Sequence, residues 1–133
     1  MPKPSTPPER KTLTRDGAEG RAVHDIGGLA FGAIDRSEHD PTLWEKRTDA
    51  MLILLVGPKK GAFKIDALRR VIEDYGQQEY DRTEYYEKWI RAIRNLVVEQ
   101  EILSAEEIEA RMAEVAKRHA KTGRKVSTAK IAW

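Results

Sequence analysis

The stretch that decides the fold is residues 81–97, DRTEYYEKWIRAIRNLV. Its large apolar side chains recur three or four residues apart, which is typical of one face of an α-helix. These side chains are Tyr86, Trp89, Ile90, Ile93, Leu96 and Val97. Asp81 and Glu84 precede them with the Asp-x-x-Glu spacing of a capping box. The sequence therefore predicts a long amphipathic helix that begins near residue 81.

A second helix is expected well before this one. Asp40 is a favourable N-cap residue, and Pro41 suits the first helical position because its fixed φ matches a helix. Gly57-Pro58 then ends the helix. Large side chains recur at helical spacing between these limits: Leu43, Trp44, Arg47, Met51, Leu54 and Leu55.

Two further helices flank the central one. The first covers about residues 65–75 and ends at Gly76. One of its faces is apolar and carries Ile65, Leu68, Val71, Ile72 and Tyr75. The second opens with a capping box, Ser104 and Glu107, and runs to about Ala120. Its apolar stripe is narrow, so it contributes little to a core.

These patterns predict an all-α fold, a small bundle of about four helices in residues 41–120. Residues 1–20 are proline-rich and polar without periodicity, and we expect them to be disordered. Residues 21–40 form an extended arm whose glycines permit positive φ. Its apolar side chains need a surface to cover, which in so small a chain is another subunit. Residues 121–133 form a basic C-terminal tail.

The composition supports a role inside a larger assembly. Only 40% of the 133 residues are apolar and 35% are charged, so four short helices bury a thin core. The sequence has no cysteine, which excludes disulfides, a thiolate metal site and a cysteine nucleophile in this chain. The longest apolar run, Ala50 to Val56, is far too short to span a membrane, and no secretory signal is visible, so we expect a cytoplasmic protein.

The charged residues give few specific signals. Positive and negative side chains are interspersed, with a net charge of +2, which argues against a nucleic-acid surface. His24, His39 and His119 have no metal-ligand spacing. Residues 117–130 are basic without any acid, and they form either a solvated tail or a strap onto a partner.

Two side chains stand out as candidate site residues. Tyr85 and Tyr86 point about 100° apart on a helix, so only Tyr86 fits the apolar stripe and Tyr85 is free to line a cleft. Arg69 lies at the edge of its helix's apolar face, where partial desolvation calls for an anionic partner. Asp66 or Glu73 of the same helix could supply that anion.

The order of these motifs resembles the N-terminal half of the nitrile hydratase β subunit and the equivalent subunit of thiocyanate hydrolase. The motifs are HDIGG at 24–28, FGAI at 31–34, WEK at 44–46, GAF at 61–63, IDALR at 65–69 and YYEKWI at 85–90. The resemblance covers about residues 22–118. The arm, the arginine helix and the Tyr-Tyr-x-x-Trp helix carry it in this order.

The resemblance implies a metalloenzyme whose metal lies in another chain. A partner α-type subunit holds non-corrin cobalt(III) or iron(III) in a cysteine-rich loop, and this chain binds no metal. By motif position, Arg69 contacts the oxidised sulfur oxygens and Tyr85 lines the pocket, with Tyr86 and Trp89 as substrate-binding candidates. The arm then contacts the partner through His24, Asp25, Gly27, Gly28 and Phe31.

The resemblance also sets the alternatives. The family's C-terminal β-barrel is missing before Trp133, so we expect a separate small barrel subunit and a hetero-oligomer. The leading interpretation is nitrile hydration to an amide, and thiocyanate hydrolysis is the alternative substrate. A metallochaperone related to the β subunit and an unrelated helical interaction module remain as other classes.

Overall fold

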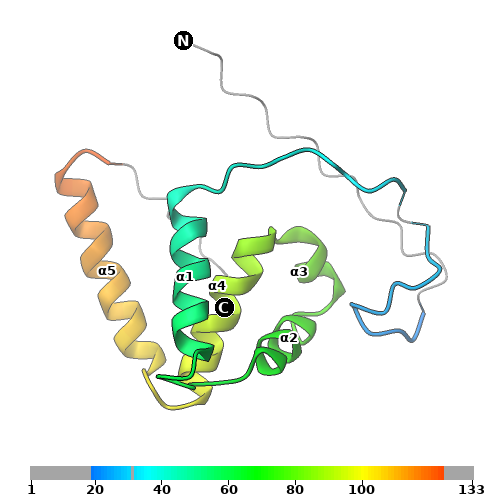
Figure 1. Cartoon of the computed structure of the whole chain (residues 1–133). Coiled ribbons are helices and arrows are strands. Elements are labelled where there is room, and N and C mark those ends of the chain that lie inside the picture. Colours follow the sequence, from blue (N-terminus) through cyan, green and yellow to red (C-terminus); the bar gives the residue numbers. More distant parts are fainter. Residues whose placement is uncertain (1–18, 31, 125–133) are drawn as a thin grey trace, which may run out of the picture.

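The apolar stripe of residues 86–97 lies on helix α4 (Tyr85–Glu99), which is the centre of the fold. Helices α1 (Leu43–Val56) and α2 (Ile65–Glu73) both pack against it (Figure 1). The computed structural model describes residues 19–30 and 32–124, in which α3 (Gln77–Arg82) and α5 (Ala105–Lys121) complete five helices without a strand. The predicted all-α bundle is confirmed, with one helix more than expected.

The additional helix, α3, corrects the predicted start of the central helix. Residues 77–82 form this separate short helix, and α4 begins after Glu84. The capping box joins Glu84 to Glu87, whose Oε2 accepts from the Glu84 backbone N–H at 2.8 Å. The Asp81–Glu84 pair therefore does not cap α4, because Asp81 already lies inside α3.

Helix α1 also begins later than predicted. Thr42 is the N-cap residue in place of Asp40, since Glu45 stands three residues after it and completes a capping box. The Thr42 backbone N–H donates to Glu45 Oε2 at 2.7 Å. This bond holds the pKa of the buried Glu45 carboxyl below its usual value.

Most of the large side chains predicted at helical spacing on α1 are exposed, with Leu55 as the exception that packs against the core. The buried positions are Glu45, Thr48 and Leu52, whereas Met51 is 41% exposed and Leu54 is 73% exposed. Thr48 tolerates burial because its hydroxyl donates to the Trp44 carbonyl at 2.9 Å. The spacing predicted the helix correctly, but most of the side chains in it do not face the core.

The core lies where α2 crosses α4. It consists of Leu52, Phe63, Leu68, Val71, Ile72, Ala92, Ile93, Leu96 and Val97. Leu96 and Ala92 are fully buried.

Helix α2 ends at Glu73 and not at Tyr75 as predicted. The Tyr75 hydroxyl donates to the Lys88 carbonyl of α4 at 2.8 Å. Burial raises the pKa of Tyr75 to about 12.

A buried arginine ties α3 to this core. Arg91 of α4 is 6% exposed, and its guanidinium lies 4.5 Å from the centre of the Tyr75 ring. The same group contacts Glu79 of α3 at 3.4 Å. Because α3 has no buried residue of its own, this contact helps to hold it against α4.

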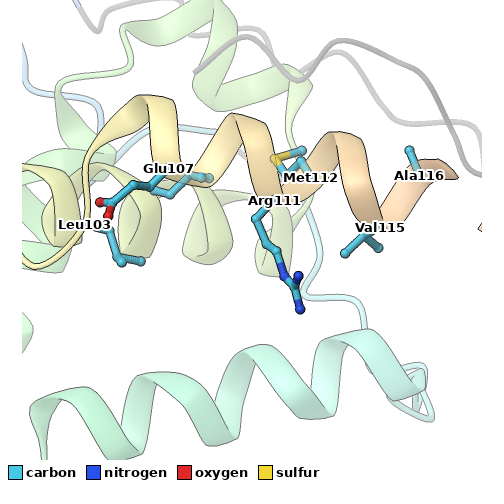
Figure 2. Close-up of a pocket in the computed structure, with 7 residues that line it drawn as sticks. Leu103, Glu107, Arg111, Met112, Val115 and Ala116 are labelled. Atoms are coloured by element: carbon cyan, nitrogen blue, oxygen red, sulfur yellow. The ribbon is translucent and has the colours of Figure 1, made fainter. Parts of the chain in front are cut away.

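Helix α5 lies beside α1, on the side away from α2 and α3 (Figure 1). The predicted Ser104–Glu107 capping box is confirmed, and Ser104 Oγ accepts from the Glu107 backbone at 3.1 Å. The helix has no buried residue and carries an apolar groove of about 420 Å³. Figure 2 shows Leu103, Arg111 and Val115 of this groove pointing toward α1. Among the described residues, no helix is long and apolar enough to cross a membrane.

Candidate functional site: a cleft between the arm and helices α2, α3 and α4

Four segments enclose a cleft of about 320 Å³. It is lined by His24 from the arm, Ile65, Leu68, Arg69 and Ile72 from α2, Tyr80 from α3, and Tyr85, Lys88 and Trp89 from α4. Arg69 and Tyr85, which were selected on different helices, therefore lie on the same cleft. The buried Leu68 and Ile72 connect its apolar wall to the core.

Arg69 stands on the open side of the cleft. Its side chain is 66% exposed, more than its place at the edge of the apolar face predicted. It pairs with Asp66, one of the two expected anions, at 3.4 Å. The pair joins two exposed side chains on one helix, which is a weak interaction, so a stronger anion can replace Asp66. Arg70, by contrast, is bound to Glu99 at 2.7 and 2.9 Å.

Tyr85 and Trp89 form an aromatic wall on α4. Their ring centroids are 5.0 Å apart, as expected for residues one helical turn apart. Partial burial raises the pKa of the Tyr85 phenol, and the neighbouring Tyr86 and Asp49 raise it further. Tyr85 therefore stays protonated at neutral pH and presents a hydrogen-bond donor.

Lys88 and Tyr80 also line the cleft, although the sequence analysis did not select them. Lys88 donates to the Thr83 carbonyl at 2.6 Å, and its ammonium lies 4.4 Å from the Tyr80 ring centre. One signal for Lys88 was present, because Tyr85, Lys88 and Trp89 are at i, i+3 and i+4 and share one helix face. Tyr80 carried no such signal, since α3 was not predicted.

Tyr86 lies next to the cleft without lining it, because its ring contacts those of Tyr85 and Trp89 at 5.3 and 5.4 Å between centroids. Its ring meets Trp44 of α1 edge-on, with 6.4 Å between the centroids, and it is not among the lining residues. Tyr85 lines the cleft and Tyr86 joins α4 to α1, but the two rings still meet edge-on at 5.3 Å between centroids, so they are less separate than predicted.

The arm residues that were expected to contact a partner are mostly exposed. Asp25, Gly27 and Gly28 are open to solvent, and Gly28 has the positive φ of 77° that glycine adopts without strain. His24 instead contacts its own chain, with Nδ1 2.8 Å from Glu73 Oε1. Phe31 lies outside the described residues.

The lining suits a small ligand that carries negative charge or a hydrogen-bond acceptor. It includes the basic residues His24, Arg69 and Lys88, and the described lining residues include no carboxylate. No group of three or more His, Cys, Asp or Glu side chains in the described part of the chain could hold a metal ion.

Comparison with known proteins gives the family. The sequence profile described as "Nitrile hydratase beta subunit, N-terminal" matches residues 21–131. The chain belongs to the nitrile hydratase β-subunit family. It is 33% identical over 90 residues to the nitrile hydratase β subunit of Pseudomonas putida, a match that covers 65% of this chain and 41% of that subunit. The chain thus spans about two fifths of the curated nitrile hydratase β subunits that it matches.

Within this family, the thiocyanate hydrolase β subunit of Thiobacillus thioparus is similar over a larger share of its length. It is 28% identical over 112 residues, which are 84% of this chain and 70% of that subunit. The solved structure of recombinant thiocyanate hydrolase apo-enzyme has the same fold, with a TM-score of 0.69 at 23% identity over 97% of this chain and 83% of that chain.

Proposed function

We propose that this chain is the β-type subunit of a nitrile hydratase-like metalloenzyme, which adds water to a nitrile to give an amide. The observation that carries the proposal is the meeting of Arg69 and Tyr85 on one cleft. Both residues belong to motifs that resemble those of a nitrile hydratase pocket, IDALR at 65–69 and YYEKWI at 85–90, which lie on different helices.

In this proposal the chain completes a site built by two other subunits. An α-type subunit holds cobalt(III) or iron(III), which acts as a Lewis acid toward the carbon–nitrogen triple bond. A separate small β-barrel subunit covers the remaining side. No residue of this chain is assigned as a metal ligand, which agrees with the lack of cysteine in its sequence.

Arg69 is assigned to the partner's oxidised cysteine ligands. Its guanidinium can donate two parallel hydrogen bonds to sulfur-bound oxygens, and this fork would orient the ligands of the metal. The weak pair with Asp66 leaves the group able to turn toward a partner. A lysine could replace the charge but not the fork.

Tyr85 and Trp89 are assigned to the substrate. The protonated phenol of Tyr85 can donate a hydrogen bond to a nitrile nitrogen or to the water that attacks it. The ring of Trp89 provides apolar area beside it. Tyr86 contacts α1 and is assigned to packing.

Thiocyanate hydrolysis is the second candidate, and two observations favour it. The chain covers 70% of a thiocyanate hydrolase β subunit, against 41% of a nitrile hydratase β subunit. The cleft lining also contains basic residues and, among those described, no carboxylate, which suits an anionic substrate such as thiocyanate.

The experiment is coexpression of the tagged chain with an α-type chain that carries a Cys-x-x-Cys-x-Cys motif and with a small β-barrel chain of the same family. We expect all three to elute as one complex that releases an amide from a nitrile. Turnover of thiocyanate without nitrile hydration selects the second candidate. An active complex that lacks this chain contradicts both and favours a metallochaperone.

A further inference from the structure

We propose that His24 is a positioning residue that fastens the arm to helices α2 and α3 of its own chain and thereby closes one side of the cleft. The sequence motif assigned His24 to a partner interface. In the structure His24 also contacts helices of its own chain. This contact does not depend on a partner subunit.

His24 makes two contacts with the helical body. Its Nδ1 lies 2.8 Å from Glu73 Oε1 on α2, and its ring meets the Tyr80 ring of α3 edge-on at 5.1 Å between centroids. The side chain is 36% exposed, whereas that of the adjacent Asp25 is 61% exposed. His24 thus joins three segments at one point, and the same ring lines the cleft.

The loop around His24 is closed by its own hydrogen bonds. The Asp25 backbone N–H donates to the Ala22 carbonyl at 2.9 Å, and Leu29 donates to Ile26 at 3.1 Å. The Arg21 guanidinium reaches across the loop to the Gly27 carbonyl at 2.7 Å. Because these bonds give the loop a fixed shape, a single anchor at His24 can fix the orientation of the whole loop.

A second histidine holds the other end of the arm. His39 Nε2 lies 3.2 Å from Glu45 Oε2, next to the start of α1. Figure 1 shows the arm running between these points, from beside α2 and α3 to the first turn of α1. The exposed stretch between them includes Gly27 and Gly28. If the proposed function holds, a partner meets an arm that is already placed, which lowers the entropy cost of association.

The test is ¹⁵N relaxation on the full-length chain, with order parameters measured at Ile26, Gly27 and Gly28. We expect values of about 0.8 in the wild type and below about 0.6 in His24→Ala. His24→Asn should recover part of the order, since its amide nitrogen occupies the place of Nδ1. His39→Ala is the matched control, because it removes a histidine–glutamate contact at the other end of the arm and should leave these three residues ordered.

A double-mutant cycle with Glu73→Ala, which removes the acceptor of the His24 hydrogen bond, separates this contact from a general loosening of the fold. We expect each single variant to mobilise the loop and the double variant to add nothing further. Unchanged order in His24→Ala, a wild-type loop that is already mobile, or additive effects would each overturn the proposal. The α4 amide signals report that each variant is folded, and Glu73→Ala alone suffices should His24→Ala unfold. Since no partner is present, failure here is distinct from failure of the proposed function.

Discussion

Two leucines give the sharpest test of how the chain folds. Leu96 of α4 is fully buried at the crossing with α2, whereas Leu54 of α1 is 73% exposed. Truncation of either to alanine removes the same atoms from a helix at nearly the same intrinsic propensity. Only the environment differs, so the two variants isolate the contribution of the core.

The expected magnitudes follow from this burial. Leu96→Ala loses the transfer free energy of the side chain and leaves a cavity, which together cost about 2 to 5 kcal/mol of unfolding free energy. Leu54→Ala should change it by no more than about 0.5 kcal/mol. At a urea dependence of about 1.5 kcal/mol/M, the midpoint of Leu96→Ala should fall by about 1 to 3 M.

The assay is urea unfolding followed by circular dichroism at the helical band. If Leu96→Ala does not fold at all, Ile93→Val makes the same test, since this residue is 3% exposed and the loss should be about 0.5 to 1.5 kcal/mol. Equal losses for Leu96→Ala and Leu54→Ala would refute the assignment of faces on α1 and α4.

Two further predictions concern pH. The pKa of Tyr75 is raised from 10.0 to about 12 in the folded chain, so the folded state keeps a proton that the unfolded state loses. The unfolding free energy should therefore fall from pH 10 to about 12. Tyr75→Phe should make this slope clearly smaller in urea titrations at each pH, and the remainder includes Tyr85, whose pKa is also raised. The pKa of Glu45 is lowered from 4.5 by the Thr42 amide, so its contribution is present above pH 4.5 and lost as pH falls through the lowered pKa. Glu45→Ala should therefore melt at a lower temperature at pH 7 and show a smaller acid-induced decrease, and an unchanged acid profile would contradict the capping role.

Periodicity was sufficient for the main helices. Ile93, Leu96 and Val97 of α4 and Leu68, Val71 and Ile72 of α2 lie in the core as their spacing indicated, and Trp89 packs against it. Tyr86 and Ile90 of the same predicted stripe are not part of the core. The Ser104–Glu107 box marked the start of α5 correctly, because its signal is local and needs no tertiary contact.

The sequence failed where polar residues are buried. Glu45, Thr48 and Arg91 lie in the interior. A capping bond satisfies Glu45 and a backbone carbonyl satisfies Thr48. Arg91 pairs with Glu79 through Nη1, while its buried Nε has no hydrogen-bond partner. Helix α3 escaped prediction because its six residues, QQEYDR, carry no apolar stripe. Whether such a residue is buried depends on the residues that it contacts in the folded chain. A single sequence does not show those contacts.

The candidate site shows the same limit. Motif resemblance selected Arg69 and Tyr85, but the helical stripe grouped Trp89 with Tyr86 and set Tyr85 apart, whereas the Tyr85 ring packs 5.0 Å from that of Trp89. Neither signal could show that α2 and α4 pack so that these residues meet, nor that the arm returns with His24. The cleft therefore forms through the packing of the arm and the helices. The resemblance to the family indicates what this cleft does.

The most direct test of the central claim, that Arg69 serves a partner's metal site, compares two neighbouring arginines in the assembled complex. We expect Arg69→Lys to lower turnover at least about tenfold while the three chains still coelute, since lysine cannot donate the paired hydrogen bonds. Arg70→Lys is the matched control, because Arg70 is bound to Glu99 and does not line the cleft, and its turnover should stay close to wild type. Equal turnover in both variants, with the complex intact, would contradict the assignment of Arg69.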